Sequence, residues 1–295
     1  GARSTRVVVH PRGDERVNLL LAIAVLAYPG VLLTIALGVL YARVREPQDR
    51  TDWRVLAGTT ALRSIEGLAA FGSVVLAGLG LAFLPWPLHP ALPNAWAWVW
   101  AWAALEGAFL VPLLPALLAG VPIVVRAAIR EAQIGVAGRV LLWAALAVGL
   151  LTHSEWALVG PQGHSPLLAH LLAIIAATFA LPAAIGWGPF APETDIAPGG
   201  IAYGLDRSTI ALYRAARMVR TAALLAATLV ALLPLALLPA WAGILLVLAV
   251  FVGAAVVLRV LAGRAPRMAL PDALYLCWWR ALPLTALAVA YMGLL

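Results

Sequence analysis

Residues 190–220, FAPETDIAPGGIAYGLDRSTIALYRAARMVR, form a polar interruption between two long apolar segments of the chain. The stretch contains four arginines and three acidic residues, and its two prolines and Gly-Gly pair disfavour one continuous helix. A polar loop between apolar spans is where a membrane protein can meet a soluble partner or a polar ligand. We therefore expect the rest of the chain to act as a scaffold for this stretch.

The composition places the whole chain in a membrane. Of its 295 residues, 64% are hydrophobic and only 11% are charged, which is more apolar surface than a soluble domain of this size can bury. Several apolar stretches reach the roughly 20 residues that cross a bilayer. All twenty basic residues are arginines, and they lie at the ends of apolar segments. That distribution is typical of membrane topology and argues against nucleic-acid binding.

The apolar segments predict an all-α, polytopic membrane protein with about eight transmembrane helices in a single domain, residues 1–295. A polar tail, residues 1–16, precedes the first span, where Pro29 and Gly30 predict a kink. Residues 52–63 are compatible with an amphipathic helix at the membrane interface. The expected spans are residues 17–41, 67–84, 96–125, 140–158, 166–187, 210–238, 241–258 and 273–295.

The loops between these spans alternate in charge. Arginines occur in the loops 43–66, 126–139, 188–209 and 259–272, whereas the three intervening loops contain none. The positive-inside rule then predicts an inner-membrane protein whose main loop, residues 188–209, is cytoplasmic and whose termini both lie outside. The polar tail, with its own four arginines, runs against this assignment, and the alternation of the seven loops decides it.

Ionisable groups inside membrane spans are costly, so each is a candidate for function. Glu106 lies in the expected third span, with no Asp, Glu or Arg within nineteen positions on either side. It is interpreted either as a hydrogen-bonded glutamate near the outer interface or as one station of a proton path. Glu131, in the expected loop 126–139, is assigned to the same path, with topology anchoring as the alternative.

Arg214, Arg217 and Arg220 recur every three residues at the start of the expected sixth span, which puts them on one slowly drifting helical face. Two interpretations stay open: the side chains snorkel to the inner interface, or they form a polar wall inside the protein that faces acidic residues of the main loop. The histidines match no tight metal-ligand spacing, and the single cysteine, Cys277, cannot form a cluster site. We expect neither a metal site nor a catalytic residue.

Three stretches carry more specific patterns. Arg130-Glu131-Ala132-Gln133-Ile134 is similar to R-A-A-A-Q-x-I, and in the main loop Pro189-Phe190 and Pro192-Glu193-Thr194-Asp195 are similar to P-F-D-x-P-E-A-E. Arg264-Ala-Pro-Arg267, Pro271-Asp272-Ala-Leu and Trp279-Arg280-Ala-Leu-Pro283-Leu are similar to R-x-x-x-P-R-x-R-x-D-Q-L-M…W-K-x-x-L-P-L. With these patterns the chain resembles the membrane heel subunit of respiratory complex I, known as subunit 1, and its counterparts in energy-converting membrane-bound hydrogenases.

The resemblance implies a non-catalytic core subunit that binds no cofactor alone. In the family, this subunit shares a quinone cavity with peripheral-arm subunits that hold iron-sulfur clusters and the quinone site. It also adjoins antiporter-like membrane subunits and begins a route of carboxylates for proton translocation. The residues that the resemblance assigns to the quinone cavity and its coupling loop are Arg43, Arg45, Glu193, Asp195, Asp206, Arg214 and Arg217.

The chain departs from the family pattern where residues 196–198 replace two loop glutamates and where no carboxylate stands near Ala137 or Gly138. A divergent member is therefore expected: an anchor and coupling subunit of a complex I-like NADH-quinone oxidoreductase in the respiratory chain. The alternatives are the matching subunit of a membrane-bound hydrogenase, or an anchor that no longer couples. A stand-alone secondary transporter is disfavoured because no paired inverted halves are visible.

Overall fold

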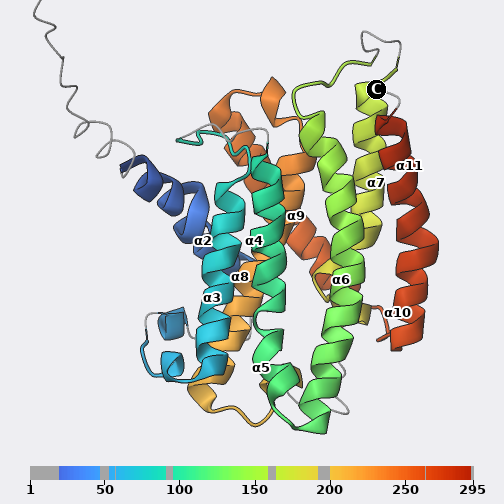
Figure 1. Ribbon diagram of the computed structural model, residues 1–295. Coiled ribbons are helices and arrows are strands. Elements are labelled where there is room, and N and C mark those ends of the chain that lie inside the picture. The colour runs from blue at the N-terminus through green and yellow to red at the C-terminus, as the bar shows by residue number, and fades with distance from the viewer. Residues whose placement is uncertain are drawn as a thin grey trace, which may run out of the picture.

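The computed structural model describes residues 20–46, 53–56, 58–90, 96–158, 164–191, 200–262 and 264–293, and all regular structure in these ranges is helical (Figure 1). Seven helical stretches in this part of the chain are long and apolar enough to cross a membrane, which confirms the all-α, polytopic class. The principal helices are α2 (Val31–Arg45), α3 (Ile65–Ala82), α4 (Ala97–Leu110), α5 (Leu113–Leu118), α6 (Pro122–Leu151), α7 (Pro166–Ala184), α8 (Arg207–Leu232), α9 (Ala240–Ala262), α10 (Leu270–Leu276) and α11 (Leu282–Met292).

Helix α8 is the centre of the bundle. It contacts α2, α3, α4, α6, α7 and α9. In its apolar 18-residue stretch, 89% of the residues are buried, against 22% in that of α9. The helix begins where the side chain of Asp206 accepts hydrogen bonds from the backbone N–H groups of Ser208 and Thr209. It ends at Leu232, because Leu233 precedes a proline and adopts an extended conformation.

The connections between helices gather at two opposite ends of the bundle (Figure 1). One end holds the short turns that precede α3, the junction of α5 with α6, and the start of α8. The other end holds the end of α3, the start of α4, the end of α6, the start of α7 and the end of α11. The described arginines of the expected basic loops, except Arg139, belong to the first end, which is here called the arginine end.

The expected third and fourth spans need correction. Residues 126–139 were predicted to be a loop, but they lie within α6, a continuous helix of 30 residues. The real break lies earlier, where α4 ends at Leu110 and Pro112 starts the short α5, and where Gly120, with a φ of 67°, and Pro122 start α6. No proline follows Pro122 within α6, so the arginines and Glu131 in this region did not interrupt the helix.

Other boundaries of the predicted spans are partly right. Residues 26–30 form the π-helical turn η1 (Leu26–Gly30), in which Tyr28 and Pro29 leave helical geometry, so the predicted kink is confirmed. The predicted interfacial helix at residues 52–63 is wrong for the described residues, because η2 (Trp53–Leu56) and η3 (Ala61–Arg63) are separate short 3-10 turns. The polar tail lies outside the described residues.

Two glycines allow helices to approach each other closely around the centre. A Cβ atom on Gly38 of α2 would lie 2.7 Å from a side-chain carbon of Val219 in α8, and one on Gly138 of α6 would lie 2.4 Å from the backbone nitrogen of Ala184. Both distances are far inside van der Waals contact. Small residues at such crossings are the usual means of packing helices tightly inside a membrane.

Candidate functional site

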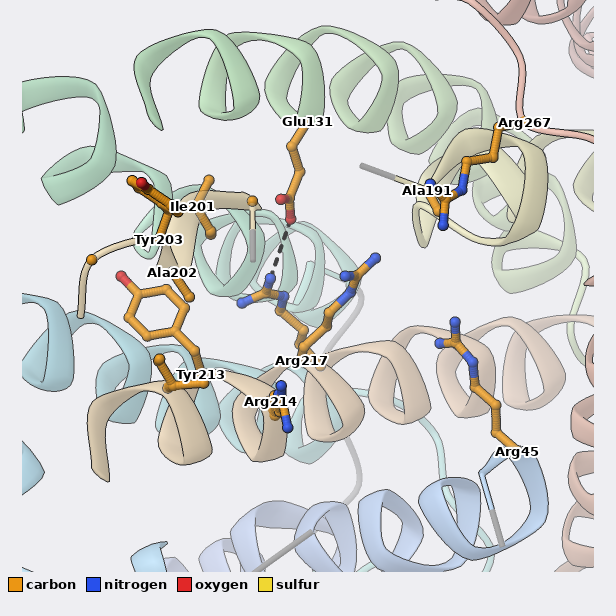
Figure 2. A pocket seen from close by; sticks show the side chains of 14 residues that line it. Arg45, Glu131, Ala191, Ile201, Ala202, Tyr203, Tyr213, Arg214, Arg217 and Arg267 are labelled. Atoms are coloured by element: carbon orange, nitrogen blue, oxygen red, sulfur yellow. Dashed lines mark hydrogen bonds and ion pairs between the residues drawn. The ribbon is translucent and has the colours of Figure 1, made fainter. Parts of the chain in front are cut away.

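A cavity of about 520 Å³ opens at the arginine end, beside the start of α8 (Figure 2). We refer to it as the arginine cavity. Apolar and aromatic side chains of Ile201, Ile210, Tyr203 and Tyr213 form part of its wall. The charged side chains of the wall are Arg45, Glu131, Arg214, Arg217, Arg220 and Arg267. The main loop borders the cavity on both flanks, through Ala191 and Gly200.

Helix α8 supplies three of the five arginines at graded depth. Arg214 is exposed, Arg217 is partly buried and Arg220 is only 2% exposed, as expected when a three-residue spacing drifts around a helix of 3.6 residues per turn. Both interpretations of this triplet therefore hold in part. Arg214 reaches the surface, whereas Arg217 and Arg220 form a polar wall inside the protein.

Arg220 pairs with Glu131, a residue of α6 and not of the main loop. Its Nη2 atom donates to Oε1 of Glu131 at 3.3 Å, while the two remaining nitrogens, Nε and Nη1, are buried without a hydrogen-bond partner among the described residues. A single long contact leaves much of the charge of this guanidinium uncompensated. This partner was not among the acids of the main loop that the sequence analysis considered, two of which, Glu193 and Asp195, lie outside the described residues.

A second ion pair lies deeper in the bundle. Arg139 of α6 forms two parallel hydrogen bonds with Glu106 of α4, from Nε to Oε2 at 2.7 Å and from Nη2 to Oε1 at 2.9 Å. Its Nη1 atom also donates to the carbonyl oxygen of Ala184 at 3.4 Å. This two-point geometry is the strongest arrangement available to an arginine and a carboxylate. Glu106 is thus a partnered carboxylate.

Phe109 lies between the two pairs. The guanidinium carbon of Arg139 is 4.6 Å from the centre of its ring, and that of Arg220 is 5.5 Å from the same centre. Cation–π contacts of this length stabilise a desolvated guanidinium on an aromatic face. The ring therefore attracts two like charges.

Arg217 is held by the turn that follows α7. Its Nη2 atom donates to the carbonyl oxygen of Gly186 at 3.1 Å. Gly186 has a φ of 61°, in the left-handed region that favours glycine, and this conformation turns the chain immediately after the last turn of α7. The hydrogen-bond acceptor of Arg217 is thus a neutral carbonyl group, which does not cancel the positive charge that Arg217 brings to the cavity wall.

The three stretches that carry the family resemblance meet at the arginine end. The backbone N–H of Met268, in the last basic loop, donates to the carbonyl oxygen of Pro189 at 2.9 Å. Arg130 of α6 donates from Nη2 to the carbonyl oxygen of Met268 at 2.6 Å. Segments up to 138 residues apart in the sequence are therefore joined beside the arginine cavity.

The other residues named from the sequence occupy different positions. Arg43 is exposed and is not part of the cavity wall, whereas Arg45 lines it. Asp206 caps α8, and its hydrogen bonds with Ser208 and Thr209 hold the pKa of its carboxyl group well below the usual range. Glu193 and Asp195 lie outside the described residues.

Several residues of the site were missed from the sequence. Arg139 was expected at the start of a span and not at the depth of Glu106, because residues 126–139 were taken for a loop. Arg267 was quoted only as part of a resembling stretch and was not assigned to the cavity, and Tyr203 and Tyr213 were not named as site residues. The useful signal was the absence of any proline from residue 123 to residue 160, which places Arg139 within the membrane and calls for a buried partner.

The fold and the arginine cavity together define a multi-pass helical membrane protein with a charged site at one end. Comparisons with protein-family models and with curated proteins found no match. Among solved structures, the chain is similar to one from the membrane-bound sulfane sulfur reductase, described as an archaeal respiratory membrane complex. The two chains are 19% identical, the likeness covers 93% of this chain and 99% of the other, and the TM-score is 0.61. This chain therefore has the fold of a chain found in a respiratory membrane complex.

Proposed function

We propose that the chain is the membrane anchor and coupling subunit of a complex I-like respiratory oxidoreductase. The observation that carries the proposal is the meeting of all three resembling stretches at one end of the bundle, where Arg130, Met268 and Pro189 are hydrogen-bonded. A fold shared with a chain of a respiratory membrane complex supports the same assignment. Sequence patterns that serve a common docking site are expected to come together in space, as these do.

In this proposal the arginine end faces the cytoplasm and carries a peripheral arm of iron-sulfur and quinone-site subunits. Arg43 and Arg45 stand at the mouth of a quinone cavity that is shared with those subunits. The chain itself holds no cofactor, and antiporter-like subunits lie beside it in the membrane. The same proposal treats residues 1–295 as a single transmembrane domain.

The arginine cavity is the proposed coupling element. Within the described part of its wall, Glu131 and Arg220 share one contact, which is long enough to be exchanged for another partner. A change of charge in the docked arm would shift that balance, together with Glu193, Asp195 and Asp206 of the main loop. Both oxygens of the Glu106 carboxylate accept from Arg139, so Glu106 could carry a proton only after this pair separates. The pair is therefore a barrier in any proton path that includes Glu106.

Co-purification tests the anchoring role. The chain, extracted from its native membrane in a mild detergent, is expected to carry stoichiometric iron-sulfur subunits, visible as an iron-sulfur absorbance and by mass spectrometry. A stable chain without such subunits would favour a stand-alone transporter and overturn the proposal.

Proton movement tests the coupling role. In proteoliposomes that contain the assembled complex, Glu193→Gln or Asp195→Asn is expected to slow turnover or uncouple it from proton transfer while assembly is retained. Arg63→Gln, at an exposed residue outside the cavity wall and outside the three resembling stretches, provides the control. If both loop variants show wild-type turnover and proton transfer, the coupling role is rejected and the chain is a non-coupling anchor.

A second candidate follows from the structural comparison. The similar structure is named a sulfane sulfur reductase, so the peripheral arm of this complex could reduce sulfane sulfur in place of quinone. A hydrogenase arm is the third possibility. Supplying the purified complex separately with a quinone, a polysulfide or hydrogen, and following electron transfer in each case, distinguishes the three.

A further inference from the structure

The last membrane-spanning stretch, Leu270–Met292, carries an arginine near its middle. The stretch consists of α10, the π-helical turn η7 (Cys277–Ala281) and α11, and Arg280 lies in η7. At 1.5 Å per residue, Arg280 is about 15 Å from the start of the stretch and about 18 Å from its end. Turns of the π type within α-helices are frequent at functional sites.

Two hydrogen bonds fix the depth of Arg280 against the neighbouring helix α7. At the arginine end, the backbone N–H of Met268 donates to the carbonyl oxygen of Pro189 at 2.9 Å. At the opposite end, the backbone N–H of Ser165, the N-cap of α7, donates to the hydroxyl oxygen of Tyr291 at 3.1 Å. Arg280 follows Met268 by 12 residues and precedes Tyr291 by 11, so it lies level with the middle of α7. Snorkelling serves arginines near the ends of a span and not one at its middle.

The side chain of Arg280 is not part of the interior of the bundle. The final stretch packs on α6 and α7 at one edge of the bundle (Figure 1). Its inner face consists of buried small residues: Ala273, Cys277, Ala281, Thr285 and Ala288. Arg280 is exposed, and no hydrogen bond, ion pair or ring contact joins its side chain to another described residue. Arg139, in contrast, is buried and fully paired with Glu106.

Three aromatic side chains accompany Arg280 on the exposed side of the stretch. Tyr275, Trp278 and Trp279 are 62%, 53% and 66% exposed, and the ring centres of Tyr275 and Trp279 are 5.9 Å apart. We call these four residues the Arg280 face. Interfacial aromatic belts lie at the two membrane surfaces, whereas Trp278 and Trp279 adjoin the middle of this span. Tryptophan, tyrosine and arginine are the residues that most often dominate the binding energy of protein interfaces.

The charge of Arg280 limits what can cover this face. Acyl chains of lipids offer a guanidinium no acceptor, and a charge at the centre of a bilayer is costly unless it is paired. A second copy of the chain is a poor partner, since Glu106 and Glu131, the acids in the interior of the described helices, are each bound by an arginine of their own chain. The complementary group is therefore a carboxylate from a different polypeptide.

We propose that the Arg280 face binds a membrane-spanning helix of another polypeptide, and that this helix carries an aspartate or glutamate opposite Arg280. The guanidinium fork would hold the carboxylate at two points, the geometry that Arg139 and Glu106 form inside the bundle. The exposed tryptophans would pack on apolar side chains of the same helix. This inference goes beyond the proposed function, because it requires no iron-sulfur arm.

Cross-linking in the native membrane tests the identity of the partner. A photoreactive phenylalanine analogue replaces Trp279, the membranes are irradiated, and the cross-linked peptide is identified by mass spectrometry. We expect a peptide from an apolar, membrane-spanning segment of another polypeptide, with an aspartate or glutamate within one helical turn of the cross-linked position. The same analogue at Trp241, which is also 66% exposed but lies at the start of α9, is the matched control and should not label that peptide.

Substitutions test the charge. Arg280→Leu is expected to lower the amount of this partner that co-purifies with each chain about tenfold, the effect of losing one charge-assisted contact. Arg280→Lys keeps the positive charge and should retain most of the partner, and Arg63→Leu, at an exposed arginine of the arginine end, should retain all of it. The isolated Arg280→Leu chain should unfold at the wild-type temperature, because Arg280 contacts no other described side chain by hydrogen bond or ion pair.

The inference is overturned if the analogue at Trp279 labels only lipid, a second copy, the same chain or a segment without an acid. Equal amounts of partner with Arg280→Leu and Arg63→Leu would overturn it as well. So would a lowered unfolding temperature of isolated Arg280→Leu, since a structural role would then explain the lost partner. A chain that holds the acidic helix but no iron-sulfur subunit would contradict the proposed function and leave this inference intact.

Discussion

The two ion pairs on either side of Phe109 differ in the way they are built. Glu106 and Arg139 share two hydrogen bonds of 2.7 and 2.9 Å, whereas Glu131 and Arg220 share one of 3.3 Å. The arginines are almost equally buried, with 3% and 2% of their side chains exposed. The difference therefore lies in pairing and not in how far the two arginines are exposed. The first pair is complete in itself, while the second borders a cavity and leaves donors unused.

The contrast suggests a division of roles. A buried pair with full bidentate geometry can hold two helices in a fixed register, as α4 and α6 are held here. A loosely paired guanidinium beside an open space can exchange its partner for a ligand or a proton donor. The deep pair is then structural, and the pair at the cavity is the one that can respond to a docked arm.

The largest expected effect is the loss of the deep pair. Glu106→Gln leaves the buried charge of Arg139 without its counter-ion and should lower the free energy of unfolding in detergent by about 3–5 kcal/mol. Replacing both partners, Glu106→Leu with Arg139→Leu, should restore most of the loss. A Glu106→Gln variant as stable as the wild type would show that this pair does not hold the bundle together.

The next effect concerns the helix approach that positions Arg139. Gly138→Val places a side chain against the backbone nitrogen of Ala184, which a Cβ atom would already approach to 2.4 Å. Overpacking of this kind should cost about 1–3 kcal/mol, because α6 and α7 must separate. Gly72→Val, at a position where a Cβ atom meets nothing within 4 Å, is the matched control for the thermal unfolding measurement.

A smaller effect is expected at the cavity pair. Glu131→Gln removes one long contact and should lower the free energy of unfolding by about 1–2 kcal/mol, less than Glu106→Gln. In the assembled complex, Glu131→Gln should nevertheless impair redox-linked proton transfer, although the complex remains folded. The comparison fails if Glu131→Gln proves to be the more destabilising of the two glutamate substitutions.

The smallest effect belongs to the cap of α8, which is remote from both pairs. The folded-state pKa of Asp206 lies below its usual value of 3.8, so the contribution of the cap is complete above that pH. It disappears as the pH falls through the folded-state pKa. Asp206→Ala should lower the thermal midpoint slightly at pH 7, and acidification should narrow the gap between the variant and the wild type.

The general class of the protein was predictable because it depends on composition. Long apolar segments bounded by arginines leave little choice besides a helical bundle in lipid, and Pro29 marked a real kink. The prediction of a loop at residues 126–139 was wrong for a physical reason. The charged residues were taken as a sign of a loop, but a helix tolerates charged side chains when protein surrounds them.

The site was predictable only in part. Arg45, Arg214 and Arg217 were named from the sequence and do line one cavity. The partners of Glu106 and Arg220 were not predictable, because they depend on which faces of α4, α6 and α8 meet. The spacing of residues along the sequence predicts which side chains share a face of one helix. An ion pair between two helices depends also on how the two helices are rotated relative to each other.

The central place of α8 has a consequence for biogenesis. Its most apolar stretch has a mean hydropathy of 1.5, against 2.9 for that of α9, and the helix contains Arg214, Arg217 and Arg220. Such a helix does not move readily from the translocon into lipid by itself, since arginine is among the costliest residues to insert. We expect it to enter the bilayer together with already synthesised α2 and α3, so that partitioning into lipid and tertiary assembly become one event for this part of the chain.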